Sequence, residues 1–245
     1  METTLTKIAL LVDGDNAQPK LLRLSLEEAS KYGKVTIRRI YGDWTTPKMN
    51  GWKDLLNELA FSPIQKFSYT TGKNSTDSAL IIDAMDILHD ELVNGFCIVS
   101  SDSDYTGLAK RIREGGIFVM GIGEKKTPSA FVKSCEIFTY CENIDKTINE
   151  IKKNKTVKQE KKTQNKNDKP VANLEIINKA FEMSIGESEL VYISTIGTNI
   201  RKLDPSFDSR TYGYKTLSAF FEGLEGFEVV SKMINGANCL FLKRK

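Results

Sequence analysis

The chain has 245 residues, 40% of them apolar, which is enough for one large domain or for a medium domain with a small partner. No stretch approaches the roughly 20 apolar residues of a membrane-spanning helix, and no secretion signal is recognisable. We therefore expect a cytoplasmic protein without a membrane partner. The four cysteines form no C-x-x-C pair and there is one histidine, which argues against a zinc site or a disulfide framework.

The net charge of +3 is unevenly distributed along the chain. Residues 146–170 carry 9 basic and 3 acidic side chains, whereas residues 1–145 are slightly acidic and residues 171–245 are balanced. Such a run is usually a solvated linker, although a flexible polycation also attracts phosphate backbones. We predict a domain at 1–145, a basic flexible linker at 146–170 and a small domain at 171–245.

Strand-like apolar stretches recur through the first part of the chain, at Ile8–Val12, Val35–Tyr41, Ile64–Tyr69, Phe96–Val99, Ile117–Ile122 and Ile137–Tyr140. Helical patterns lie between them, the longest at Ala79–Val93. On that helix, Asp83 and Asp86 are expected to face water, and His89 is expected to be a mid-helix surface residue. Alternating strands and helices predict an α/β fold with a mostly parallel sheet covered on both faces.

Acidic residues follow two of these strands. Asp13 comes directly after Ile8–Val12, and Asp102 and Asp104 come shortly after Phe96–Val99. If the two strands are neighbours where the strand order reverses, both sets open into one crevice. Asp77 lies in the first turn of the long helix, where it either joins the other acids or simply caps the helix.

Converging carboxylates repel one another and stay ionised together only when a cation neutralises them. Oxygen ligands without histidine or cysteine favour Mg²⁺ or Mn²⁺, which suit phosphodiester hydrolysis. Around the acids, Asn16 and Ser101 are candidates to orient water or phosphate, although either also suits a helix cap. Lys73 is a candidate contact to a nucleic-acid backbone, although most surface lysines have no such role.

The last part of the chain has the pattern of three helices and a hairpin. Pro170 suits a first helical turn, and helices are expected over the following residues, over 189–203 and over 212–224. Two short apolar runs flanking Asn235-Gly236 predict a β-hairpin. The expected fold is a small winged-helix-like module.

The acidic motifs resemble those of the NYN domain family, a branch of the PIN-like nucleases. The matching stretches are I-A-L-L-V-D-G-D-N at 8–16, K-N-S-T-D-S-A-L-I-I-D-A at 73–84 and I-V-S-S-D-S-D-Y at 98–105. The resemblance covers about residues 6–145 and implies a PIN-like Rossmannoid sheet and a metal-dependent ribonuclease. Asp13, Asp77, Asp102 and Asp104 match the family's acidic positions, as catalytic residues and as ligands for Mg²⁺ or Mn²⁺. Ser100-Ser101 departs slightly from the Ser-Gly common in the family.

The C-terminal part resembles the OST-HTH/LOTUS domain. The matching stretches are F-D-S-R-T-Y-G-Y-K-T-L at 207–217 and G-F-E-V at 226–229. This resemblance implies a winged-helix fold that binds RNA or protein partners. Four residues are candidate RNA contacts because they are expected at a helix N-terminus: Arg210, Tyr212, Tyr214 and Lys215.

Two other functions remain open at this point. Asp13-Gly14-Asp15 after a strand also resembles the D-x-D motif of haloacid-dehalogenase-type phosphatases, but Asn16-Ala17 replaces the residues usual after it. A catalytically inactive RNA-binding adaptor would carry the same acids. The oligomeric state, including a homodimer, is also left open.

Overall fold

The computed structural model describes residues 6–67, 75–144, 172–186, 189–234 and 236–245. The chain forms two compact units, residues 1–149 and 150–245, which we describe one at a time. Lys73, Tyr69, Pro170 and the predicted basic linker lie outside the described residues. Within the described residues, none of the helices combines the length and the apolar character needed to cross a bilayer.

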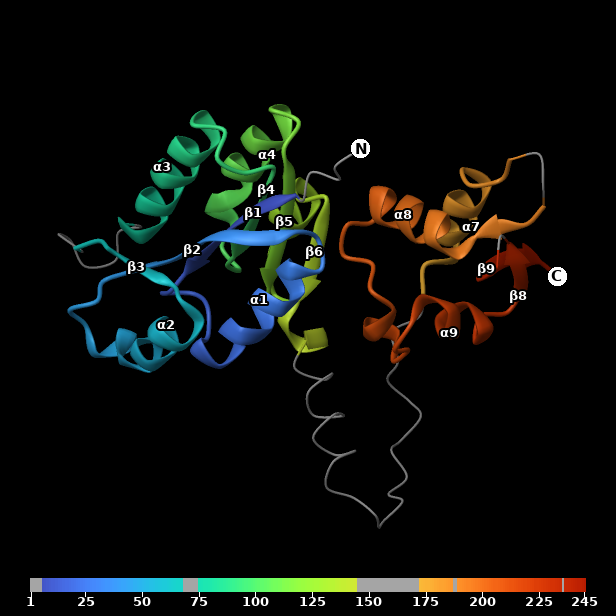
Figure 1. The fold of residues 1–245 in the computed structure, drawn as a ribbon, viewed down its shortest axis with the longest axis horizontal. Helices are drawn as coiled ribbons and strands as arrows, with labels where there is room; N and C mark the ends of the chain where they lie inside the picture. Colours follow the sequence, from blue (N-terminus) through green and yellow to red (C-terminus); the bar gives the residue numbers. More distant parts are fainter. Residues whose placement is uncertain (1–5, 68–74, 145–171, 187–188, 235) are drawn as a thin grey trace, which may run out of the picture. The chain divides into compact units, whose positions relative to one another are not determined.

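The first unit is built on a six-stranded sheet in which each neighbouring pair is parallel. Its strands are β1 (Lys7–Asp13), β2 (Lys34–Gly42), β3 (Ser62–Gln65), β4 (Gly95–Val99), β5 (Phe118–Gly123) and β6 (Ile137–Tyr140). The spatial order is β3-β2-β1-β4-β5-β6 (Figure 1). The α/β fold predicted from the alternating pattern is confirmed.

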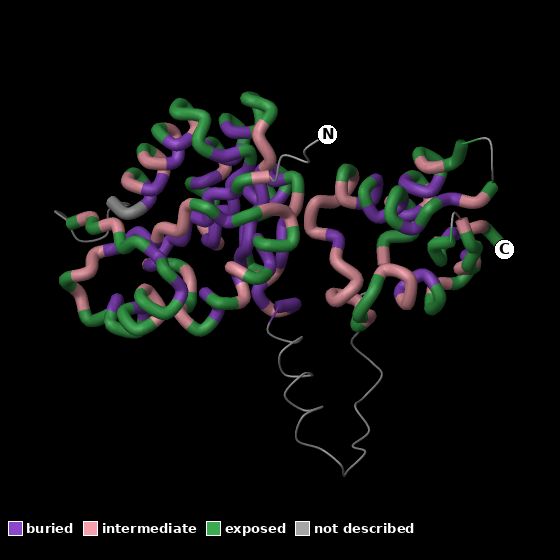
Figure 2. Tube along the Cα trace, in the orientation of Figure 1, coloured by how far each residue is buried: buried purple, intermediate pink, exposed green. Residues whose placement is uncertain are grey.

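Helices cover both faces of this sheet (Figure 1). On one face lie η1 (Pro19–Leu21), α1 (Leu22–Ser30), η2 (Pro47–Trp52) and α2 (Lys53–Leu59); on the other lie α3 (Ser75–His89), η3 (Ser103–Tyr105), α4 (Thr106–Glu114) and α5 (Ser129–Ser134). An apolar core lies on each face of the sheet. Alternate residues of β1 pack into one core or the other, because successive side chains of a strand point to opposite faces. Leu10 packs with Leu22 and Trp52, and Leu11 packs with Leu80. The buried strands form the purple centre of this unit in Figure 2.

The strand order reverses between β1 and β4. The chain builds β1, β2 and β3 outward, then returns to place β4 on the free side of β1, with Val12 opposite Val99. Parallel strands end at the same edge of a sheet, so the residues that follow both strands lie together. Asp13 and residues 100–104 therefore share the edge at which open α/β sheets bind ligands.

Three local predictions in this unit need correction. The third strand ends at Gln65 instead of continuing to residue 69, and α3 ends at His89, so this exposed histidine closes the helix. Asp83 does not simply face water: its carboxylate accepts hydrogen bonds from Arg39 and Tyr41 on β2. The amphipathic pattern missed this pairing because it does not show which polar residues meet a neighbouring strand.

The described residues of the second unit form three α-helices, one short 3-10 helix and a three-stranded antiparallel sheet. Its elements are α7 (Leu174–Glu182), β7 (Val191–Tyr192), α8 (Ile193–Leu203), η4 (Ser209–Tyr212), α9 (Leu217–Glu222), β8 (Phe227–Ile234) and β9 (Ala237–Arg244). The strand order is β7-β9-β8, and a core of Ile177, Phe181, Ile196, Phe221 and Leu242 lies between helices and sheet. The predicted winged-helix-like fold is confirmed.

The predicted third helix of this unit is interrupted. Gly213 has a φ of 83°, a left-handed conformation that ends η4, and Thr216 then caps α9 by accepting a hydrogen bond from the backbone N–H of Ala219. The helix expected after Pro170 begins at Leu174, with Asn173 as its cap. These breaks follow local capping chemistry that the apolar periodicity alone does not reveal.

Candidate active site

Asp13 is the last residue of β1 and is fully buried, with 0% of its surface exposed. One carboxylate oxygen accepts hydrogen bonds from the backbone N–H groups of Asp15 (3.1 Å) and Asn16 (3.3 Å). The other accepts from the Asn16 Nδ2 (2.7 Å) and the Ser100 Oγ (3.0 Å). A carboxylate loses its hydration on burial, and these donors replace it. Asp13 is thus a fixed negative charge beneath the edge of the sheet.

The other three acids come together above it. Asp77 in the first turn of α3, Asp102 at the cap of η3 and Asp104 within η3 each offer a carboxylate oxygen, and these oxygens lie within 4.8 Å of one another. Asp102 also accepts a hydrogen bond from the backbone N–H of Asp104 at 3.0 Å, which holds the η3 turn. Asp13 is not a member of this close group. The four predicted acids therefore form a three-carboxylate cluster with a buried fourth carboxylate nearby.

Asp77 is the acid whose ionisation is most affected by these surroundings. Burial raises its pKa above the ordinary value, and the hydrogen bond that it accepts from the Tyr105 hydroxyl at 2.7 Å lowers it. The charges of Asp13, Asp102 and Asp104 raise it further. The cluster thus disfavours its own ionisation when no positive charge is present.

A hard divalent cation fits this cluster. The donor atoms are all carboxylate oxygens, which Mg²⁺ and Mn²⁺ prefer, and the crowding that raises the pKa of Asp77 is the repulsion that a cation would relieve. Asp102 and Asp104 are partly to fully exposed, so the cluster opens toward solvent. The residues present therefore suit a metal ion that a substrate phosphate can also reach.

Two residues proposed to assist the acids have different contacts in the structure. Asn16 lies against the acids through its bond to Asp13, whereas the Ser101 Oγ accepts a hydrogen bond from the backbone N–H of Glu124 at 2.9 Å, beyond β5. Ser101 therefore ties two loops together at the sheet edge. Its neighbour Ser100 is the serine that bonds to Asp13, and its Oγ also accepts from the backbone N–H of Asp102 at 3.1 Å.

Comparison with protein families identifies the family to which each part of the chain is similar. The model of the NYN domain matches residues 7–152. The chain belongs to the NYN domain family. The model of the OST-HTH/LOTUS domain matches residues 175–233, so a LOTUS domain follows the NYN domain, in the order that the motifs predicted. The two matches support an RNA-related nuclease with an RNA-binding domain.

Two solved structures similar to this NYN protein are described as proteins of unknown function or as uncharacterized. A protein of unknown function from Vibrio parahaemolyticus is 22% identical, with 57% of this chain and 95% of that chain covered and a TM-score of 0.49. An uncharacterized protein from Nitrosomonas europaea is 26% identical, with 37% of this chain and 90% of that chain covered and a TM-score of 0.31. No curated protein matches the chain.

The candidate contacts in the LOTUS domain lie around the break between η4 and α9. Arg210 donates from Nε to both carboxylate oxygens of Asp208, at 3.0 and 2.9 Å, so much of its charge is engaged within the domain. The rings of Tyr212 and Tyr214 pack against Phe220, with ring centroids 5.3 and 5.7 Å away. Lys215 is exposed immediately before the cap of α9. A role in RNA binding remains a prediction for all four.

Sequence reasoning did not single out Ser100 and Tyr105, which donate hydrogen bonds to Asp13 and Asp77. Tyr105 is fully buried, and its hydroxyl donates a hydrogen bond to Asp77 at 2.7 Å. The spacing gives a partial signal, since Tyr105 follows Asp104 directly and begins the turn into α4. Nothing in the sequence alone shows that α3 brings Asp77 to that hydroxyl.

Proposed function

We propose that this NYN protein is a metal-dependent ribonuclease that hydrolyses RNA phosphodiester bonds. The observation that carries the proposal is the three-carboxylate cluster of Asp77, Asp102 and Asp104, at the carboxyl edge of a sheet in the NYN family. The LOTUS domain supports RNA as the substrate class. In this proposal Asp77, Asp102 and Asp104 hold Mg²⁺ or Mn²⁺.

A divalent cation at the cluster would supply positive charge to the substrate phosphate and would make a water molecule more acidic. Hydrogen bonds within the protein orient the carboxylates that would bind this cation. Tyr105 donates to one oxygen of Asp77 and so orients that carboxylate. Ser100 and Asn16 hold Asp13, which adds negative charge near Asp77 and thereby strengthens the attraction for a cation. Asp13, Asn16 and Ser100 are thus positioning residues in this proposal.

The buried state of Asp13 argues against the phosphatase alternative. A phosphatase of the D-x-D type uses its first aspartate as the attacking nucleophile, which must reach the substrate phosphorus. Asp13 has no exposed surface, and both of its oxygens accept hydrogen bonds from neighbouring groups. We therefore expect slow or undetectable release of phosphate from small monoesters.

The decisive experiment measures cleavage of single-stranded and folded RNAs by the full-length protein with Mg²⁺, with Mn²⁺ and with EDTA. We expect cleavage only with metal, and loss of cleavage with retained RNA binding in Asp102→Asn. Asp86→Asn is the matched control, because Asp86 is an exposed aspartate on α3 away from the cluster. Unchanged RNA binding with no cleavage in any metal would instead establish the RNA-binding adaptor.

The LOTUS domain is proposed to add RNA or partner recognition to the nuclease. The two units are compact separately, so removal of residues 171–245 is expected to leave the NYN domain folded. The truncated protein should bind long RNA more weakly and still cleave short RNA. Loss of cleavage in a truncated protein with an intact fold would show that the LOTUS domain takes part in the reaction.

A further inference from the structure

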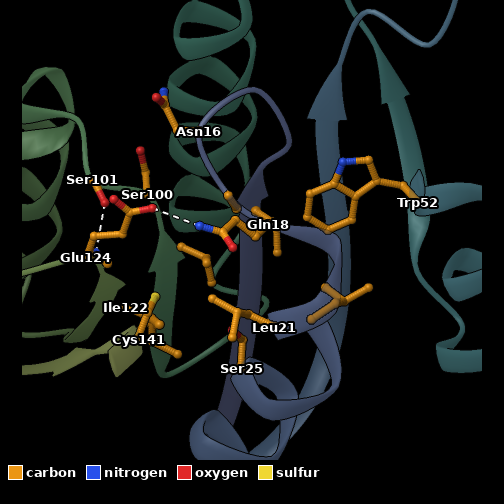
Figure 3. Close-up of a pocket in the computed structure, with 15 residues that line it drawn as sticks. Asn16, Gln18, Leu21, Ser25, Trp52, Ser100, Ser101, Ile122, Glu124 and Cys141 are labelled. Carbon is orange, nitrogen blue, oxygen red and sulfur yellow. Dashed lines mark hydrogen bonds between the residues drawn. The ribbon is translucent and has the colours of Figure 1, made fainter. Parts of the chain in front are cut away.

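A second feature opens at the same edge of the sheet, on the opposite face from α3 and α4. A pocket lies between the ends of β1, β4 and β5 and the helices η1 and α1 (Figure 3). Its walls are apolar, from Val12, Leu21, Trp52, Val99 and Ile122. Polar side chains stand at its rim, from Asn16, Gln18, Ser100, Ser101 and Glu124. Apolar walls with a few polar groups are typical of a small-molecule site.

Ser25 gives the pocket an unused polar group. Its side chain lines the pocket from α1 and is 1% exposed, and within the described part of the chain its Oγ has no hydrogen-bond partner. A buried hydroxyl without a partner destabilises the fold, because its lost hydration is not replaced. Ser30 on the same helix shows the usual solution, because its hydroxyl donates to the Leu26 carbonyl at 2.7 Å. The Ser25 hydroxyl is therefore available to a ligand.

The pocket is joined to the acidic site by two shared side chains. Asn16 and Ser100 line the pocket, and both donate to the same carboxylate oxygen of Asp13, at 2.7 and 3.0 Å. The pocket therefore adjoins the Asp13 carboxylate, which lies at the same edge of the sheet as the acidic cluster.

A hydrogen bond closes the rim of the pocket, and Glu124 on that rim pairs with Lys126 at 2.8 Å. Gln18 donates from Nε2 to Glu124 at 3.0 Å (Figure 3), and both residues belong to loops at the sheet edge. Lys20 and Lys126 lie close enough to lower the pKa of Glu124. The cavity volume is about 20 Å³, and the empty space with the open mouth included is about 360 Å³. A ligand larger than water must therefore displace the Gln18 contact.

We propose that this pocket binds one unpaired base of the RNA strand whose phosphate lies at the acidic cluster. The proposal rests on the proposed ribonuclease function and adds a specificity site to it. The flat base occupies the space between Trp52 and the strand ends, and its polar edge pairs with the Ser25 hydroxyl. The closed pocket holds about one water molecule, so a base enters only when the Gln18 side chain moves aside, and a pyrimidine requires less movement than a purine. Folded RNA with no unpaired base near the scissile bond is then a poor substrate.

The test begins with binding, which does not require cleavage. Calorimetry on the full-length protein with Mg²⁺ compares uridine 5′-monophosphate with ribose 5-phosphate, which carries the same phosphate and no base. We expect uridine 5′-monophosphate to bind at least about tenfold tighter, because burial and stacking of a base contribute about that much or more. Equal affinities of the two compounds would overturn the proposal.

Two variants locate the base. Ser25→Ala removes the unpaired hydroxyl, so it should preserve or raise the melting temperature while weakening uridine 5′-monophosphate several-fold and leaving ribose 5-phosphate unchanged. Ser30→Ala is the matched control in the same helix and should leave both affinities unchanged. Ala17→Leu fills the half-buried mouth of the pocket and should also abolish the preference for the base. A base preference that survives both Ser25→Ala and Ala17→Leu would place the base elsewhere and refute the assignment.

Failure of this inference can be told apart from failure of the proposed function. An RNA with a single abasic residue should lose cleavage at the adjacent bond while other bonds are cut at the normal rate. Metal-dependent cleavage that ignores the abasic residue would overturn the base pocket and leave the ribonuclease standing. A preference for uridine 5′-monophosphate that is lost in Ser25→Ala, with no cleavage in any metal, would support the pocket and overturn the ribonuclease.

Discussion

Asp102→Asn is the substitution that best separates the charge of the acidic cluster from its shape. Asp102 caps η3 by accepting a hydrogen bond from the backbone N–H of Asp104. Asparagine caps about as well as aspartate, so the turn is expected to survive. What disappears is one negative charge of the cluster. The variant should therefore be more stable than the natural protein without metal and should gain less from metal.

The size of the effect follows from the spacing of the carboxylates. Two unit charges 4.8 Å apart repel by about 3.5 kcal/mol at an effective dielectric constant of about 20. Asp102 is partly exposed, and solvent screening reduces the relief expected from removing its charge to about 1 kcal/mol. In urea this corresponds to a rise in the unfolding midpoint of about 0.5 M.

Tryptophan fluorescence is a suitable measurement, because Trp44 and Trp52 both lie in the first unit and report its unfolding alone. In EDTA we expect the midpoint of Asp102→Asn to exceed that of the natural protein. With Mn²⁺ at a hundredfold excess over its dissociation constant, the natural protein should gain about 2.7 kcal/mol and the variant much less. Asp86→Asn is the control. A variant no more stable than the natural protein in EDTA, or equal stabilisation by Asp86→Asn, would refute the reasoning.

Three further substitutions test other parts of the first unit. Tyr105→Phe should lower the free energy of unfolding by about 1.5–3 kcal/mol in the same urea assay, because Asp77 loses a buried hydrogen bond; an unchanged midpoint would contradict the contact. Ser100→Ala should cost about 1–3 kcal/mol and slow RNA cleavage, since Asp13 loses a donor; normal cleavage would remove Ser100 from the site. Burial raises the pKa of Glu136, so the folded state holds this proton more tightly than the unfolded state, and its contribution to stability falls as pH rises from its ordinary value of 4.5 through the raised pKa. Glu136→Gln should flatten that decline in midpoints measured between about pH 4 and 7, and an unchanged slope would contradict it.

The sequence contains enough to predict the sheet and the edge at which the acids meet. Fully apolar stretches such as Ile8–Val12 are typical of central parallel strands, and the acids that follow them must emerge at the same edge. This argument uses strand direction alone, and it correctly places Asp13 at the same edge of the sheet as Asp102 and Asp104. It does not predict depth, so it could not show that Asp13 lies buried beneath the cluster.

Contacts between distant segments account for what the sequence did not predict. The partners of Asp77 and Asp83 come from η3 and β2, far along the chain, and periodicity carries no information about such pairs. The unpaired hydroxyl of Ser25 is invisible for the same reason, because an ordinary serine in a helix bonds to its own backbone. The helix predicted over 212–224 is broken for a local reason: Gly213 adopts a left-handed conformation, which ends η4.

The contacts of Asp83 give the acidic site a dependence on β2. Asp83 lies six residues after Asp77, about 9 Å along the same helix, and Arg39 and Tyr41 fasten it to the sheet. The helix that presents Asp77 is thus held to the sheet by residues outside the three-carboxylate cluster. Loss of the Arg39 contact would free this part of α3 to shift and move the Asp77 carboxylate away from Asp102 and Asp104, so a substitution at Arg39 is expected to weaken the proposed metal site although every acid is retained.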